Sequence, residues 1–227
     1  MSSRNVRNHF DEEADRYDAL IVRLIPGYAE QHAAVLSAIP FARDAAIRVL
    51  DLGCGTGALS GIVLREFPNA TVRAIDLAPN MLAEYAARHS AHVGRFDCEV
   101  GDLADHELGN GHDLIVSGLA IHHLGDEGKR DLYRRIAEAL VPGGVFIQRE
   151  LILGETAEET ERFHAEWREF MARNGEDVER WFSAYLAEDR PASLSANLAW
   201  LEEAGLTDVA CYWQRANFAV FGGARAA

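Results

Sequence analysis

The chain has 227 residues, 48% of them hydrophobic, and its acidic residues outnumber its basic ones by 36 to 22, giving a formal net charge of −14. This length and apolar content suffice for one sizeable core, so we expect a single domain over residues 1–227. The negative charge disfavours attraction to nucleic acid or an anionic membrane, and we expect neither as a partner.

The first forty residues predict two helices. Apolar residues recur at spacings of three and four from Phe10 to Leu24, with acidic residues where a helix N-terminus favours them. The pair Pro26-Gly27 interrupts this helix, and a second one runs from Tyr28 to Ile39 before Pro40.

Between residues 47 and 150 short apolar runs alternate with helical segments, which is typical of a parallel sheet with crossover helices. The expected strands are Ile47–Leu52, Thr71–Asp76, Phe96–Val100, Asp113–Ser117 and Gly144–Glu150. The expected helices lie near Ala58–Glu66, Pro79–His89 and Lys129–Leu140.

After Leu153 the alternation stops, and residues 154–192 form an aromatic-rich helical insertion. Ordinary core packing explains its bulky face, and a homodimer contact is the alternative. A helix from Ala192 to Ala204 follows and ends at Gly205. The last two runs, Asp208–Trp213 and Asn217–Phe221, predict an antiparallel pair at the sheet edge.

The sequence also predicts the cellular location of the protein. No apolar run approaches the ~20 residues that a membrane-spanning helix needs, and the polar start has no signal-peptide stretch. The three cysteines are widely spaced and form no Cys-x-x-Cys pair, so we expect reduced thiols and no metal site. We therefore expect a cytoplasmic protein.

The strand ending at Leu52 runs directly into Gly53-Cys-Gly-Thr-Gly57 and then a helix, which is the position of a cofactor loop. The glycines alone also satisfy the relaxed dinucleotide pattern, so NAD remains an alternative ligand. An acid two residues before the loop, Asp51, would repel a pyrophosphate but suits a ligand with ammonium and sulfonium charges.

Two further acids follow successive strands. Asp76 ends the second strand, where an acid binds ribose hydroxyls in this topology, and Asp102 comes just after the third, placed for an adenine amino group. Each acid alone has a structural explanation, such as a helix cap or a loop carboxylate. As a set they favour S-adenosylmethionine over NAD.

These segments resemble class I S-adenosylmethionine-dependent methyltransferases over essentially the whole chain, from about Phe10 to Gly223. The resemblance rests on Val49–Gly57, Ala74–Met81, Gly101–Leu103, Asp113–Val116 with His122–Leu124, and Leu140–Gly144. It implies an α/β, Rossmann-like fold, a seven-stranded doubly wound sheet with the last strand antiparallel, and a helical lid over residues 1–40. The implied cofactor-binding residues are Tyr28, Asp51, Gly53, Cys54, Gly55, Gly57, Asp76, Leu77, Met81, Asp102, Leu103, Ser117 and Gly118.

A narrower similarity links the chain ends to carboxy-S-adenosylmethionine synthases of tRNA wobble-uridine modification. It rests on Phe10-Asp-Glu-Glu13, Arg23-Leu-Ile-Pro-Gly-Tyr28 and Phe218-Ala-Val-Phe-Gly-Gly223. In that family the tyrosine matching Tyr28 touches the cofactor. The arginine that holds the extra carboxylate there aligns with Phe182, and Arg180 lies nearby, so we expect ordinary S-adenosylmethionine here.

Methyl transfer to oxygen, nitrogen, sulfur or carbon of a small acceptor needs few catalytic groups, since the methyl donor is already activated. His122 and His123 follow the fourth strand and are candidate general bases. Packing and helix capping are their structural alternatives. Glu150, at the end of the fifth strand, is the third catalytic candidate, with an ion-paired carboxylate as its alternative, and core packing explains Tyr17 in the lid.

Three other functions stay open at this point. They are a carboxy-S-adenosylmethionine synthase or another tRNA-modification enzyme, a non-catalytic module that binds S-adenosylmethionine, and an NAD-dependent oxidoreductase. The acceptor depends on side chains of the N-terminal helices and the insertion, which the sequence pattern does not place in space.

Overall fold

The computed structural model describes residues 17–227, with side chains from Ala19 onward. The first half of the predicted N-terminal helix, the similarity at Phe10–Glu13 and the Tyr17 side chain lie outside the described residues. Within the described range the first helices are α2 (Tyr17–Leu24) and α3 (Tyr28–Ala38), separated by Gly27 at a φ of 68°.

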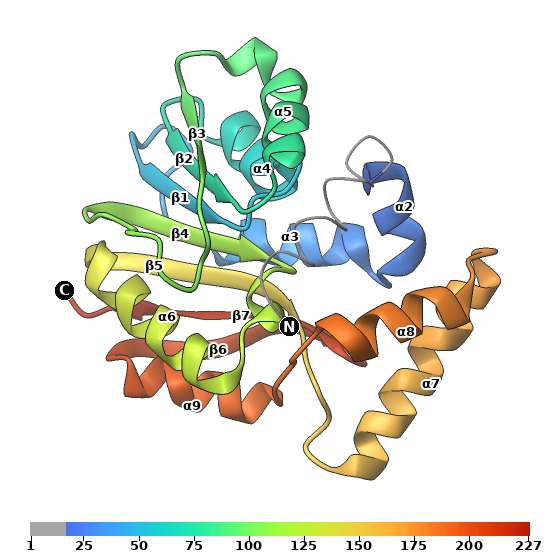
Figure 1. Cartoon of the computed structure of the whole chain (residues 1–227). Coiled ribbons are helices and arrows are strands. Elements are labelled where there is room, and N and C mark those ends of the chain that lie inside the picture. Colours follow the sequence, from blue (N-terminus) through green and yellow to red (C-terminus); the bar gives the residue numbers. More distant parts are fainter. Residues whose placement is uncertain (1–16) are drawn as a thin grey trace.

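A seven-stranded sheet with the order β3-β2-β1-β4-β5-β7-β6 forms the centre of the molecule (Figure 1). All neighbouring pairs are parallel except those that β7 makes with β5 and β6. The predicted fold, with seven strands and the last one antiparallel, is therefore confirmed. The strands are β1 (Arg48–Leu52), β2 (Thr71–Asp76), β3 (Phe96–Val100), β4 (His112–Gly118), β5 (Leu140–Leu151), β6 (Leu206–Arg215) and β7 (Phe218–Arg225).

The register of the parallel strands brings their carboxyl ends to one edge. Leu52 lies opposite Ile75 on one side and Ser117 on the other, and Gly118 lies opposite Arg149. In open α/β sheets ligands bind outside this edge, where the strand order reverses. Here the reversal falls between β1 and β4, directly beside the glycine loop.

Helices cover both faces of the sheet. On one face α3 and α4 (Ala58–Glu66) bury apolar side chains against β1 and β4, and α5 (Pro79–Arg88) packs beside them. On the other, α6 (Asp126–Ala139) and α9 (Leu194–Glu203) enclose a second cluster that includes Tyr133 and Phe146. The central strand β1 is buried from Val49 to Leu52, as expected for a strand covered on both sides.

Two helices, α7 (Ala157–Arg173) and α8 (Val178–Glu188), project from the carboxyl end of β5, with α2 beside them (Figure 1). The Trp167 indole N–H donates to the Leu24 carbonyl, 2.7 Å away, and its ring packs edge-on against Tyr185 and Phe218. These contacts join the insertion to α2 and to the sheet, so residues more than a hundred positions apart share one apolar cluster.

The structure lengthens several predicted elements. Helix α6 starts three residues before the predicted Lys129, because Asp126 and Glu127 suit its N-terminus. Strand β5 starts at Leu140 rather than Gly144, with an irregular register beside His112. None of the helices in residues 17–227 has the length and apolar character to cross a membrane.

Candidate active site

The glycine loop lies between β1 and α4, and its three glycines have left-handed backbone conformations. Gly53, Gly55 and Gly57 have φ angles of 65°, 53° and 81°, which only glycine adopts easily. A Cβ on Gly53 would collide with the Cβ of Ala120. The loop therefore requires glycine both for its turns and for its close approach to the segment after β4.

Asp76 links the loop to the end of β2. Its Oδ2 accepts a hydrogen bond from the Gly55 N–H at 2.7 Å, and Oδ1 accepts one from the Ala78 N–H at 2.9 Å. The Asp76 side chain also borders the adjoining cavity. One carboxylate thus fixes the loop and faces the space above it.

A cavity of about 270 Å³ lies outside the carboxyl ends of the parallel strands. Nine of the predicted cofactor-binding residues border it: Gly53, Cys54, Gly55, Asp76, Leu77, Met81, Asp102, Leu103 and Gly118. The glycine loop and the second and third acid positions therefore meet in one space, as their positions at successive strand ends predict.

Four other predicted cofactor residues do not border this cavity. The Asp51 carboxylate is buried under the loop, where it accepts hydrogen bonds from the Ser60 N–H at 3.1 Å and the Ser60 hydroxyl at 2.6 Å. The Ser117 hydroxyl donates to the Leu52 carbonyl. Gly57 and Tyr28 border a neighbouring groove between α3, α4 and α5.

The position of Asp51 corrects the sequence argument. Its carboxylate cannot face a ligand's ammonium group directly, because it is only 1% exposed and is bonded to the start of α4. Burial is the main cause that raises the pKa of Asp51 to about 6, while the Ser60 hydrogen bonds oppose the shift. Asp51 supports the loop from below.

Arg149 also borders the cavity, a position that the sequence pattern does not predict. It is 3% exposed, and its Nε and Nη1 have no hydrogen-bond partner among residues 17–227. Its guanidinium lies 4.5 Å from the centre of the Tyr28 ring, and its Nη2 is 3.4 Å from the Tyr28 hydroxyl. A buried cation is costly when it has no ion pair, and Arg149 has none with the residues that the structure describes, so this arrangement favours an anionic ligand group.

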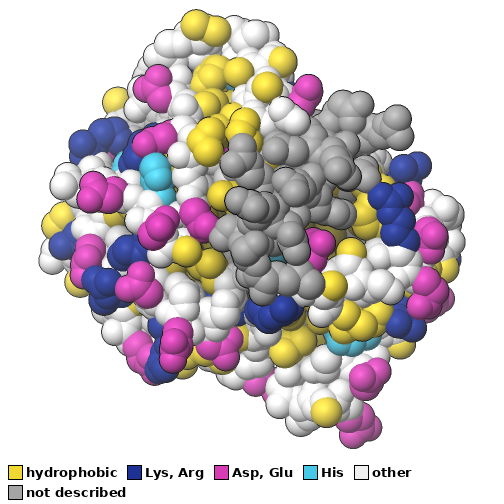
Figure 2. Space-filling view, viewed as in Figure 1, with side chains coloured by type: hydrophobic (Ala, Val, Ile, Leu, Met, Phe, Trp, Pro, Cys, Tyr) yellow, Lys and Arg dark blue, Asp and Glu magenta, His cyan; other side chains and the backbone are white. Residues whose placement is uncertain are grey.

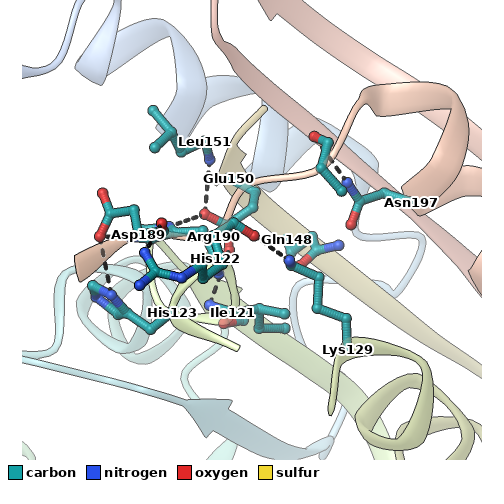
Figure 3. Close-up of polar contacts among 12 residues, drawn as sticks. Ile121, His122, His123, Lys129, Gln148, Glu150, Leu151, Asp189, Arg190 and Asn197 are labelled. Carbon is teal, nitrogen blue, oxygen red and sulfur yellow. Dashed lines mark hydrogen bonds and ion pairs between the residues drawn. The ribbon is translucent and has the colours of Figure 1, made fainter. Parts of the chain in front are cut away.

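A cluster of histidines and carboxylates lies beside the cavity, where β5, α8 and the turn Ile121–His123 meet (Figure 3). The His122 ring donates from Nδ1 to Glu150, and its Nε2 is 3.7 Å from an Asp189 oxygen. The Nδ1 of His123 lies 3.1 Å from the same oxygen. Asp189 immediately follows α8, so the fold brings it to histidines that precede it by more than sixty residues.

Glu150 has a structural role here rather than the predicted contact with substrate. It is 2% exposed and accepts backbone hydrogen bonds from Ile121, His122 and Leu151 as well as the His122 ring. These bonds use both carboxylate oxygens, and neither cavity described here includes Glu150. The carboxylate therefore positions the turn that carries the histidines.

Charge sets the protonation of this cluster. Burial would lower the pKa of His122, but Glu150 and Asp189 raise it to about 9. Burial would likewise raise the pKa of Asp189, and the two histidines hold it below its usual range. At neutral pH His122 is thus an imidazolium between two carboxylates.

The sequence pattern predicts no metal site, yet donor atoms of His122, His123 and Asp189 lie within 4.8 Å of one another. Two imidazoles and a carboxylate are a ligand set that a divalent metal can use. The contacts with Asp189 and Glu150 account for the geometry of the cluster by charge and hydrogen bonding alone.

A second cavity, which we call the apolar cavity, lies between α2, α7 and α8. Its walls are mainly aromatic and aliphatic side chains, and its polar end carries His122, His123, Glu188 and Asp189. It meets the first cavity at Leu119, His123 and Glu188, which border both.

The position that matches the arginine of the carboxy-S-adenosylmethionine synthases, Phe182, packs behind the lining of the apolar cavity against Trp167 and Tyr185. Phe182 is buried in α8 and packs edge-on against His164 and Trp167. The Arg180 guanidinium lies over the Trp181 ring. Neither Phe182 nor Arg180 borders either cavity.

Residues 49–144 match a family model described as a methyltransferase domain. This segment contains the glycine loop, the acids after β2 and β3, and the histidine turn. It ends before α7 and α8, so the match covers the first cavity better than the apolar one.

Curated relatives agree with this match. Trans-aconitate 2-methyltransferase of Mycobacterium tuberculosis is 36% identical over 100 residues, 44% of this chain and 35% of the relative. The chain thus spans about a third of the length of such relatives. Carboxy-S-adenosyl-L-methionine synthase of Chromohalobacter salexigens is 29% identical over 222 residues, 92% of this chain and 80% of the relative.

Solved structures share the fold at low identity. An O-methyltransferase family protein from Burkholderia thailandensis has a TM-score of 0.70 at 18% identity and covers 96% of this chain and 60% of its own. Phosphoethanolamine N-methyltransferase 2 of Haemonchus contortus, in complex with S-adenosyl-L-methionine, has a TM-score of 0.64 at 22% identity and covers 88% of this chain and 43% of its own.

Proposed function

We propose, from the premise that the chain belongs to the class I methyltransferases, that it transfers a methyl group from S-adenosylmethionine to a small-molecule acceptor. The observation that carries this proposal is the meeting of the glycine loop, Asp76 and Asp102 in one cavity that adjoins an apolar one. The first cavity suits the cofactor and the second suits the acceptor.

The residues around the first cavity fit the parts of S-adenosylmethionine. Asp76 has carboxylate oxygens for ribose hydroxyls, and Asp102 with Leu103 borders the region we assign to adenine, flanked by Met81. The Nε and Nη1 of Arg149, which bond no described residue, suit the carboxylate of the methionyl group. The glycine loop lets the backbone approach the ligand closely.

The reaction asks little of the protein beyond orientation and removal of a proton. S-adenosylmethionine supplies a methyl group already activated by a sulfonium. His123 borders both cavities, and Asp189 lies 3.1 Å from its Nδ1, so the carboxylate orients the ring and stabilises it once protonated. We assign His123 as the general base and Asp189 as its positioning residue.

His122 and Glu150 hold this pair in place. Glu150 borders neither cavity and so does not touch the acceptor. Their ion pair fixes the turn Ile121–His123 against β5, and the Arg190 N–H donates to the His122 carbonyl at 2.7 Å. Because of these bonds, the end of α8 and the histidine turn are held together.

We also propose that the chain acts in the cytoplasm as a single domain, with residues 1–40 as a lid and 154–192 as a helical insertion. Direct nucleic-acid binding is not part of the proposal, because Arg130, Arg134 and Arg135 of α6 pair with acids. Figure 2 shows acidic and basic side chains interspersed where α6 lies. The projecting α7 and α8 are our candidate for a homodimer contact, which light scattering tests.

A second candidate, carboxy-S-adenosylmethionine synthase, is favoured by the relative that spans most of the chain. Mass spectrometry of the co-purified cofactor separates the two functions. We expect S-adenosylmethionine or S-adenosylhomocysteine, and an adduct heavier by a carboxyl group would support the synthase.

Transfer of a labelled methyl group to a metabolite panel tests catalysis, and binding without transfer to any acceptor would support a non-catalytic module.

A further inference from the structure

We infer that the acceptor is a single aromatic ring carrying a neutral hydroxyl group, rather than a carboxylic acid. This inference rests on the proposed function, since it assigns the apolar cavity to the acceptor. It is carried by the size of that cavity, the chemistry of its walls and the position of its polar end.

The size of the apolar cavity sets the size of the acceptor. Its volume is about 130 Å³. An engineered protein cavity of ~150 Å³ lined by aliphatic and aromatic side chains binds benzene, so this space accommodates about one ring. A fused two-ring system would exceed it.

The walls favour an aromatic body. Trp167, Trp181, Tyr185 and Phe218 border the cavity from α7, α8 and β7, and Met171 adds a flexible thioether. Aromatic side chains contact a planar ring through offset or edge-to-face packing, and a methionine sulfur also packs well against rings. An acyclic dicarboxylate would gain none of these contacts.

The polar end disfavours an acidic acceptor. Glu188 and Asp189 are part of the lining, while no lysine or arginine among the described residues borders this cavity. Two cations near the end of α8 are already engaged: Arg190 donates from its two Nη atoms to the carbonyls of Asp189 and Ala187, and Lys129 donates to the Arg190 carbonyl. The His122 imidazolium at this end already lies between Glu150 and Asp189, so a carboxylate buried here would meet an excess of negative charge.

The same end suits a hydroxyl group at the junction with the cofactor cavity. His123 accepts the hydroxyl proton on the ring nitrogen away from Asp189, which stabilises the resulting imidazolium. The acceptor oxygen forms a bond to the methyl carbon as the carbon–sulfur bond breaks, and that electron pair stays on sulfur. The products are the methyl ether and S-adenosylhomocysteine.

The named relatives do not argue against this assignment. Two of them are named for acids, trans-aconitate and malonyl-[acyl-carrier protein]. The family match ends at residue 144, whereas much of the apolar cavity is built by α7 and α8. Much of the acceptor side therefore lies outside the segment on which that match depends.

Three matched probes test the inference with the full-length protein and labelled S-adenosylmethionine. We expect 4-methylphenol to be methylated with a kcat/KM at least about tenfold above that for 4-methylbenzoic acid or 2-naphthol, because charge and size exclude the last two. In the presence of S-adenosylhomocysteine, 4-methylphenol should also raise the melting temperature. Preference for the acid, or neither turnover nor a thermal shift with 4-methylphenol in protein that binds cofactor, overturns the inference.

A pair of alanines on α8 provides the matched variants. Ala184 borders the apolar cavity, whereas Ala187 is exposed on the same helix. Ala184→Leu should fill the cavity and lower kcat/KM for 4-methylphenol about tenfold or more, with cofactor affinity unchanged, while Ala187→Leu should match wild type. Equal activity of both variants would contradict the assignment, and failure of wild type to bind S-adenosylmethionine would instead refute the proposed function.

Discussion

The two cavities are built by different means. Around the cofactor cavity, backbone turns and side chains at the ends of adjacent parallel strands meet within residues 53–125, joined by Arg149 and the end of α8. Around the apolar cavity, side chains of α2, α7 and α8 meet from widely separated segments. The first region should therefore respond to changes in backbone shape, and the second to changes in side-chain chemistry and volume.

The largest expected effect is on catalysis at the junction of the two regions. His123→Ala should lower kcat by about 100- to 10,000-fold, because it removes the general base, while leaving cofactor affinity unchanged. Asp189→Asn should lower kcat less, since the base remains. His106→Ala is the control, because His106 pairs with Glu99 away from both cavities. If His123→Ala lost cofactor affinity by as large a factor as it lost kcat, the two regions would not be separable.

The next effect tests the backbone of the cofactor region. Gly53→Ala should weaken S-adenosylmethionine binding about 100-fold, because the new Cβ collides with Ala120 and a φ of 65° disfavours alanine. Gly143→Ala is the matched control, with a φ of 76° and open space around the new Cβ. Calorimetry on both variants separates the collision from backbone strain. Equal affinities would refute the close-approach argument.

Arg149→Met should change stability and binding in opposite directions. Removing a buried cation whose Nε and Nη1 bond no described residue should raise the melting temperature of the ligand-free protein, while losing the cofactor's carboxylate partner should weaken binding about tenfold. Arg95→Met is the control, because Arg95 donates to carbonyls of Leu64, Phe67 and Ala70. That variant should lose stability and keep cofactor affinity. Unchanged binding in Arg149→Met would remove Arg149 from the site.

The smallest effect concerns Asp51 and pH. Its pKa is raised from 3.8 to about 6 in the folded protein, so the unfolded chain loses this proton first as pH rises. The contribution of Asp51 to the unfolding free energy should therefore fall between pH 4 and 6, by on the order of 2 kcal/mol. Urea unfolding across this range should show that decline in wild type relative to Asp51→Asn. Parallel curves would contradict the burial argument.

The same contrast explains what the sequence could predict. Strand ends carry ligand groups in a fixed order in a parallel sheet, so Asp76 and Asp102 could be assigned from their positions alone. The direction in which a side chain points could not be predicted from its position in the sequence. For this reason Asp51 was expected in the cavity and Arg149 was not. Asp189 and the aromatic lining depend on how α7 and α8 pack, and no local pattern encodes that packing.

The central claim is that the cavity at the carboxyl edge of the sheet binds S-adenosylmethionine. Titration calorimetry of wild type and Asp76→Ala tests it most directly. We predict one equivalent of S-adenosylmethionine per wild-type chain, bound more tightly than NAD, and an affinity at least about tenfold lower in the variant, because Asp76 both faces the ligand and fixes Gly55. Equal affinities of the two proteins, or tighter binding of NAD, would contradict the claim.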